Sequence, residues 1–310
     1  MNLLRHSIAL LFLYSTVALS ADRTFSVPYD DLKVWTQSIV INLKEVTVLG
    51  SSGVHRAESD CEMHFGASVK GYAGDPVGWV LEPMNVCVVP FFGKSKQANS
   101  DWIAFGASLK NKTIGVDGVP RIWPEHLIGK DSPSNPNHAM EIHPVTRMTV
   151  GNKLYDFTKF IFAPEGFQGG LSQTTAVKIL TSLEVNVTRN GNEVEIEFDA
   201  GRIGNFTVFD LRIRRDKIES RDDGQRIIAE VVLEDKKALP VKIVTIKGTE
   251  IHTQLERFRT GRRASTRLDG LVLFSLDPAA LADAARAGGG ETTIVEKPLQ
   301  LILYGVAENE

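Results

Sequence analysis

Two Glu-x-His pairs are the residues of this sequence whose types and spacing are best suited to chemistry. They are Glu62 with His64 and Glu141 with His143. Residues two apart in a β-strand point to the same face, so each pair would present a carboxylate and an imidazole side by side. Both groups are ligands for zinc and similar divalent ions, and both are common proton donors and acceptors in catalysis. His126 and His138 lie in the adjoining segments and can contribute to the same set.

Three interpretations of the two pairs are open: a divalent metal site, structural ion pairs on a polar strand face, and a surface that contacts a ligand. Residues 138–143 lack the H-E-x-x-H helix of zinc proteases, and Pro144 prevents a helix from continuing there. The sequence therefore favours structural ion pairs over a metal. Glu82 follows the apolar run 79–81 and can lie near His64 if that run is buried. No motif marks a nucleophile, so we assign neither a catalytic residue nor a metal ligand.

The segment 123–126 is a further candidate contact. Pro124 indicates an exposed turn, and an exposed Trp beside Glu and His is suited to binding a sugar or a peptide. The candidate ligand-binding residues are therefore Glu62, His64, Trp123, Glu125, His126, His138, Glu141 and His143.

A basic segment in the second half of the chain is a candidate anion site. It carries Arg257, Arg259, Arg262, Arg263 and Arg267. Arginines this close together can dock phosphate, sulfate or an anionic polymer. A solvated loop balanced by neighbouring acidic residues is the alternative that the sequence favours. Only Phe258 is available there for base stacking, and the net charge of −3 does not favour nucleic acid as a partner.

Strand patterns in the first half of the chain can position the Glu-x-His pairs. Apolar and polar residues alternate through 39–48, with a change of phase after Leu43 that is typical of a bulge. The same alternation through 61–69 predicts a second strand. The remaining expected elements are a strand at 79–81, a helix at 100–110, and strands at 113–119 and 140–143. Three strands, a helix and two strands is the element order of an OB-type barrel.

This region also resembles a family of uncharacterised exported bacterial proteins whose segments follow the patterns D-x-x-H and E-[IL]-H-P-V. The resemblance is carried by DCEMHFGAS (60–68), WVLEP (79–83), GVPRIWPEH (118–126) and HAMEIHPVTRM (138–148), although three residues, not two, separate Asp60 from His64. It covers residues 34–150 and implies an OB-like domain of bacterial origin, without an established activity. This chain departs from the family by adding a long second β region, so a whole-protein role does not carry over.

The second half of the chain is also β-rich. Residues 151–175 are rich in Gly, Pro, Gln and aromatics and are typical of a connector. Beyond them, the strand pattern is clearest at 193–198, where Glu alternates with apolar residues. One helix is expected, capped by Asp277 and ended by glycines from Gly288.

We therefore expect an all-β protein. Residues 21–150 would form an OB-like β-barrel domain, 151–175 a connector, and 176–310 a β-sandwich-like domain with one short helix. One continuous β structure without a boundary is the alternative.

The N-terminus and the two cysteines indicate export. Residues 1–20 have the layout of a cleaved signal peptide, with an apolar run at 8–17 and small residues before Ala21. That run is too short for a comfortable membrane span, and no later stretch reaches about 20 apolar residues. We expect a periplasmic or extracellular protein with no transmembrane segment in the mature chain. In that oxidising compartment Cys61 and Cys87 favour a disulfide over two buried thiols.

Composition leaves the function open but excludes several classes. The 310 residues are 43% hydrophobic and 24% charged, which excludes a disordered or collagen-like chain. We expect an exported binding or interaction module without a cofactor, and its partner would be a small molecule, a glycan or an envelope protein. The alternative is a hydrolase that uses Glu62, His64, Glu141 and His143, with or without a divalent metal. A structural envelope component that pairs through its edge strands is the third hypothesis.

Overall fold

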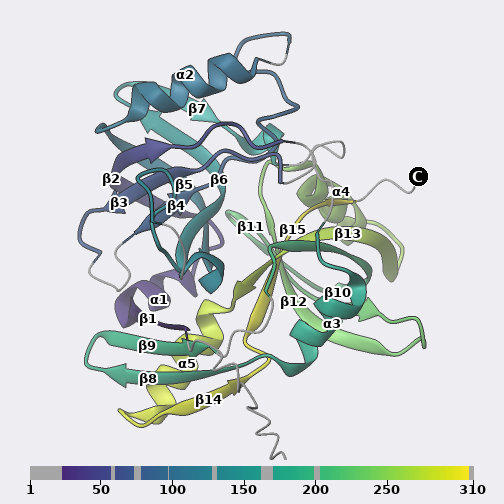
Figure 1. Ribbon diagram of the computed structural model, residues 1–310. Helices are drawn as coiled ribbons and strands as arrows, with labels where there is room; N and C mark the ends of the chain where they lie inside the picture. Colours follow the sequence, from purple (N-terminus) through teal and green to yellow (C-terminus); the bar gives the residue numbers. More distant parts are fainter. Residues whose placement is uncertain are drawn as a thin grey trace, which may run out of the picture.

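Over the described residues, the strands form two closed barrels and a four-stranded sheet (Figure 1). The computed structural model describes residues 23–56, 60–72, 78–96, 98–127, 131–161, 170–198 and 203–306. Strands make up 47% of the structure and helices 22%, so the expected all-β class is confirmed. The proposed signal peptide, residues 1–20, lies outside the described residues.

The first barrel has the OB-type topology expected from the order of its elements. Its strands are β2 (Ile41–Ser51), β3 (Phe65–Val69), β4 (Trp79–Leu81), β5 (Thr113–Ile122) and β6 (Met140–Val150). β2 pairs with β3 and β5, and the parallel pairing of β4 with β6 closes the barrel. Helix α2 (Asn99–Leu109) lies between β4 and β5 in the chain, and β7 (Lys153–Asp156) extends the sheet beyond β6.

Local patterns account for most of this barrel. The register of β2 against β5 shifts between Leu43 and Val46, where the apolar pattern changes phase. Helix α2 buries Trp102, Phe105 and Leu109, the three residues whose spacing predicts its packed face.

The strand expected over 61–69 is shorter than the alternation suggests. β3 begins at Phe65. Cys61 adopts a positive φ of 58°, which ends regular strand geometry at this point. Residues 62–64 are therefore an irregular extended segment that leads into the barrel strand.

The second barrel has the same topology as the first. Its strands are β10 (Phe206–Arg221), β11 (Gly224–Val232), β12 (Ala238–Ile246), β13 (Ser265–Leu276) and β15 (Leu299–Val306). The parallel pairing of β12 with β15 closes it, and helix α4 (Glu250–Thr260) lies between the third and fourth strands, as α2 does in the first barrel.

The second half is thus a closed barrel where the sequence suggested a sandwich, and it contains three helices among the described residues where one was expected. Alternation identifies strands but not their partners. Closure here depends on the pairing of Lys242 with Gln300 and of Phe274 with Leu301, which no local pattern reveals.

A four-stranded sheet lies beside the second barrel. Its strands are β1 (Arg23–Pro28), β9 (Glu193–Phe198), β8 (Glu184–Asn190) and β14 (Thr293–Glu296). In β9 the apolar residues are buried and the glutamates are not, as expected. Residues 23–28, which the sequence assigned to the first unit, therefore pair with residues 193–198 of the second.

Helices cover this sheet and join it to the barrels. α1 (Tyr29–Trp35) contacts α5 (Pro278–Gly288), and α3 (Gln173–Ser182) precedes β8. Asp277 caps α5 by accepting a hydrogen bond from the backbone N–H of Ala279, and Gly289 ends it in the left-handed conformation, as the sequence predicts.

The expected connector contains regular structure. Within 151–175 lie β7, the short 3-10 helix η2 (Thr158–Phe160) and the first turn of α3, while residues 162–169 lie outside the described part of the chain. Among the described residues, no helix combines the length and the apolar character needed to cross a membrane.

The two barrels pack directly against each other. The backbone N–H of Ile122 on β5 donates a hydrogen bond to Oγ of Ser275 on β13 over 3.3 Å, and the rings of Trp123 and Phe274 stack with centroids 5.9 Å apart. A separate apolar cluster joins the outer faces of both barrels. Its buried members are Ile39, Met84, Val119, Ile161, Phe206, Val244, Ile246, Leu271, Leu273, Ile302 and Tyr304. This interface covers polar side chains that would otherwise lie on the outside of the first barrel.

Candidate functional site

Five of the seven histidines of the sequence lie in one polar cluster on the first barrel, at its contact with the second. We call this set the inter-barrel cluster. It consists of His55, Asp60, Glu62, His64, Glu82, Arg121, Glu125, His126, His138, Glu141 and His143. Most of these side chains are buried. Burying so many ionisable groups costs free energy, so each buried charge needs partners that compensate for its lost hydration.

The segment between β2 and β3 supplies four members of the cluster. Its two sides are held together by backbone hydrogen bonds, from the N–H of Ser52 to the carbonyl of His64 (2.8 Å) and from the N–H of His55 to the carbonyl of Glu62 (2.9 Å). Cys61 in this segment forms the expected disulfide with Cys87, which follows β4. The disulfide and these hydrogen bonds fix the histidines and carboxylates of the segment.

Glu82 explains how the two Glu-x-His pairs meet although their strands are not neighbours. It directly follows β4, which lies between β3 and β6. The backbone N–H of Glu82 donates to the carbonyl of Ile142 (3.0 Å), and its carbonyl accepts from the N–H of Val145 (3.2 Å). Its carboxylate is thereby placed between His64 and His143.

His143 lies at the centre of the buried part. Its Nε2 is 3.0 Å from Oε1 of Glu62, and its Nδ1 is 2.5 Å from Oε2 of Glu82. Burial alone would lower the pKa of His143, but these two carboxyl groups and Glu141 raise it well above its usual value. His143 is therefore an imidazolium that joins Glu62 of the β2–β3 segment to Glu82.

Arg121 of β5 connects the cluster to the second barrel. Its guanidinium pairs with Glu141 and donates to the carbonyl of Phe274 and to Oδ1 of Asn205, both over 2.7 Å. Although burial would raise the pKa of Glu141, Arg121 and His138 hold it well below its usual range. The buried guanidinium thus has an anionic partner and two neutral acceptors.

His138 completes the pairing of Glu141. Its Nδ1 lies 2.6 Å from the carbonyl oxygen of Pro136, and its Nε2 lies 3.2 Å from Oε1 of Glu141. Burial lowers the pKa of His138, but the acceptors at both ring nitrogens outweigh it and raise the pKa. The ring stacks on that of His126, with centroids 5.2 Å apart.

Three carboxyl groups of the cluster have pKa values that differ widely. Burial raises the pKa of Glu62 to about 8, and its Oε2 has no hydrogen-bond partner in the described part of the chain. Burial also acts on Glu82, but the charge of His143 prevails and lowers that pKa to about 2. Burial raises the pKa of Glu125 to about 7. At neutral pH the cluster therefore contains both ionised and protonated carboxyl groups.

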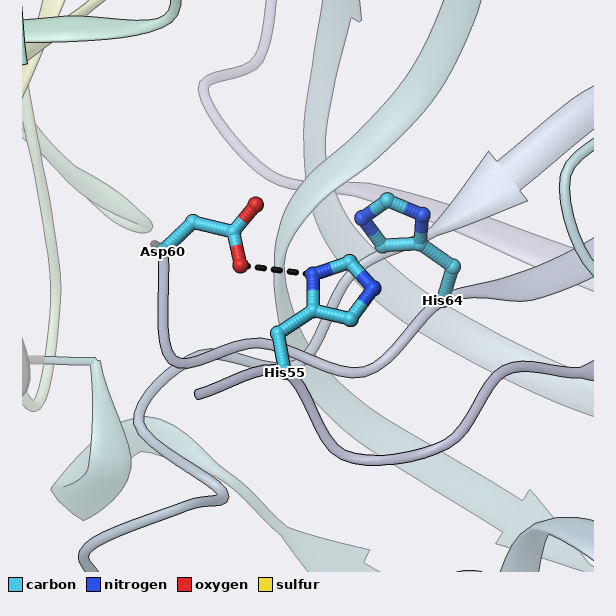
Figure 2. A group of neighbouring side chains, drawn as sticks. All are labelled: His55, Asp60 and His64. Atoms are coloured by element: carbon cyan, nitrogen blue, oxygen red, sulfur yellow. Dashed lines mark hydrogen bonds and ion pairs between the residues drawn. The ribbon is translucent and has the colours of Figure 1, made fainter. Parts of the chain in front are cut away.

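Four members are only partly buried and form what we call the rim: His55, Asp60, Glu125 and His126. Figure 2 shows His55 between Asp60 and His64, with Nδ1 of His55 2.6 Å from Oδ1 of Asp60. The rings of His55 and His64 are 4.4 Å apart between centroids, and those of His64 and His126 are 6.4 Å apart. The rim therefore leads from solvent to the buried carboxylates.

The structure brings together seven of the eight candidate ligand-binding residues; the eighth is Trp123. That residue is not exposed: it is completely buried and stacks on Phe274 of the second barrel. The expected exposed turn is the short 3-10 helix η1 (Pro124–His126), whose Pro124 is also buried. The first barrel alone would leave Trp123 at its surface, but the second barrel covers it.

His55, Asp60 and Arg121 are members of the cluster that were not among the candidate site residues, although Asp60 and Arg121 lie in the segments 60–68 and 118–126 that carry the family resemblance. A signal for Arg121 exists, because it is an isolated charge inside the apolar run 119–123 and such a charge is often buried with a partner. His55 has no comparable signal, since its role depends on the pairing of 52–55 with 62–64.

The basic segment lies outside the inter-barrel cluster. Arg257 and Arg259 are on α4, Arg267 is on β13, and Arg262 and Arg263 lie between them. Arg259 pairs with Glu256 and Arg267 with Asp210, as the solvated alternative supposes. Anion binding by this segment stays a prediction.

Comparison of the chain with protein-family models, with curated proteins and with solved structures finds no match.

Proposed function

We propose that this protein is an exported binding protein whose ligand engages the rim of the inter-barrel cluster. The observation that carries the proposal is the convergence of five histidines and five carboxyl groups, drawn from distant parts of the chain, at a place that reaches solvent. The signal-like N-terminus and the disulfide support export.

Burial favours binding over catalysis for most of these residues. Glu62, Glu141 and His143 are at most 2% exposed, so a substrate would have to displace their mutual ion pairs in order to touch them. A ligand at the rim needs no such displacement. The buried ion pairs then hold His64 and the rim in place.

A thermal-shift screen of the full mature chain tests this proposal. The probes are divalent metal ions, simple sugars and peptidoglycan fragments, because a ligand selective for the folded state raises the midpoint. We expect one class to raise the Tm of the parent and to have less effect on the variant His55→Ala/His126→Ala. The matched control is His252→Ala, which changes a partly buried histidine of α4. Equal shifts in all three proteins, or no shift from any class, would refute it.

A hydrolase is the second candidate, and Glu125 is the residue that favours it. Its carboxyl group is at the rim, its pKa is raised to about 7 by burial, and its buried Oε2 has no hydrogen-bond partner among the described residues. Such a group can give and take a proton at neutral pH. Release of product from peptidoglycan fragments by the parent but not by Glu125→Gln would establish this candidate over simple binding.

A further inference from the structure

We propose that His55, Asp60 and His64 form a binding site for a divalent transition-metal ion. The inference rests on the proposed function, because it names the chemical class of ligand that the same site takes. His55 lies outside every motif of the sequence, and neither His55 nor Asp60 is among the candidate ligand-binding residues named from the sequence.

The geometry of the three side chains carries the inference. Each offers one ligand atom, and the three atoms lie within 4.8 Å of one another. All three side chains converge on one space beside the β2–β3 segment (Figure 2). A zinc ion sits about 2.0–2.2 Å from imidazole nitrogens and carboxylate oxygens, so small rotations of these three side chains bring the atoms to coordination distance.

The donor set points to the class of ion. Two imidazoles and one carboxylate suit zinc, iron, nickel and copper better than magnesium or calcium, which prefer oxygen ligands. Three protein ligands also leave a coordination position for water or a further ligand. The side chains of His55 and Asp60 are 27% and 23% exposed, so an ion can reach them from solvent.

The buried part of the cluster supports this site from behind. Oε1 of Glu82 lies 3.4 Å from Nε2 of His64, and Glu82 is itself held by His143. Carboxylates next to metal-bound histidines orient the rings and strengthen binding. The Cys61–Cys87 disulfide fixes the backbone between Asp60 and His64.

Two other sets of three side chains in the cluster could also supply ligand atoms, but both are less suited to an ion. The first set is Glu62, His64 and Glu82, and the second is Glu82, His138 and Glu141. The carboxylates of Glu82 and Glu141 already pair with Arg121, His138 and His143, and an ion would take those partners from the buried groups.

Titration of the metal-free, oxidised, full-length mature chain with Zn²⁺ and with Co²⁺ tests the inference. Calorimetry gives the stoichiometry and affinity, and the visible absorption of Co²⁺ reports its ligands. We expect one ion per chain and at least about tenfold weaker binding in His55→Ala and in Asp60→Asn. His55 and Asp60 are partly exposed, so these variants are expected to fold. His252→Ala should bind as the parent does, and Glu62→Gln reports whether the ion lies in the buried part of the cluster instead.

The inference is overturned if neither Zn²⁺ nor Co²⁺ binds stoichiometrically, or if both His55→Ala and Asp60→Asn keep the affinity of the parent. It is also overturned if only Glu62→Gln loses binding, because that result would place the ion in the buried part of the cluster. If neither metal binds but a sugar or peptidoglycan fragment still gives a rim-dependent thermal shift, the metal site is refuted and the proposed binding function stands. If no ligand of any class binds, both fail.

Discussion

At the scale of single residues, the inter-barrel cluster shows how buried charges are made tolerable. Arg121, His138 and His143 each face carboxylates, and Glu62 is held largely protonated at neutral pH because burial raises its pKa to about 8. With Glu82 and Glu141 ionised, positive and negative charges are close to balance. The arrangement satisfies the general rule that buried charges are paired.

Removing Arg121 should break this balance. The variant Arg121→Met leaves Glu141 buried without its guanidinium, so we expect a loss of about 3–5 kcal/mol in the free energy of unfolding. Urea unfolding measures it. The matched control is Arg267→Met, which removes an arginine that is 65% exposed and should therefore change the stability far less. Equal losses of unfolding free energy in the two variants would show that the buried Arg121–Glu141 pair contributes no more to stability than the exposed one.

Glu125 should give the protein a specific pH dependence. Its pKa in the folded protein, about 7, exceeds the value of 4.5 expected when it is unfolded. Between these values the folded state keeps a proton that the unfolded state loses, so rising pH destabilises the parent through this window. Glutamine mimics the protonated acid.

We therefore expect Glu125→Gln and the parent to respond alike to pH below about 4.5. The variant should gain up to about 3 kcal/mol relative to the parent as pH rises to 7, and the difference should then stay constant. Urea unfolding across this range provides the test. A difference that shrinks with rising pH would mean that the pKa is lowered, not raised.

At the scale of elements, the β2–β3 segment holds the rim in place. The Cys61–Cys87 disulfide closes a loop with a sequence separation of 26. On the chain-entropy estimate such a loop contributes roughly 3.5 kcal/mol to stability. We expect Cys61→Ser/Cys87→Ser to lose a similar amount and to bind rim ligands more weakly.

Unfolding of the parent with and without reductant provides the matched comparison for that variant. If reduction leaves the stability unchanged, the disulfide does not constrain this segment.

Sequence patterns predicted the elements whose information is local. The alternation at 193–198 and the cap and glycine stop of α5 were correctly interpreted, as was the bulge after Leu43. α4 was missed because five arginines dominate its neighbourhood, although Ile251 and Leu255 have helical spacing and are buried. Local patterns are sufficient where the spacing of apolar residues within one element indicates which of its faces is buried.

The remaining features depend on partners distant in the chain. The second barrel closes only when β12 pairs with β15, and Trp123 is buried only when β13 packs over it. The pairs Glu62/His64 and Glu141/His143 could be named from sequence, but their convergence depends on Glu82 between them. No one-dimensional pattern specifies such contacts.

At the scale of the whole molecule, the two barrels are joined at several places. The barrels share the interface around Arg121 and Trp123, and the N-terminal strand β1 pairs with β9 of the second half. A buried, hydrogen-bonded interface of this kind couples the stability of its two sides.

We therefore expect one cooperative unfolding transition. Tryptophan fluorescence reports the first half, because all four Trp residues lie between residues 35 and 123. Far-UV circular dichroism reports both halves, so the two curves should coincide. Separate midpoints would show that the barrels unfold independently and that the inter-barrel cluster does not couple them.

The central claim is that the rim of the inter-barrel cluster binds the ligand, and histidine NMR tests it most directly. With ¹⁵N-labelled histidine, addition of Zn²⁺ or of the ligand found by thermal shift should perturb the ring signals of His55, His64 and His126. The signal of His252, on α4, should not move. Perturbation of His252 alone, or of no histidine while the ligand binds, would contradict the claim.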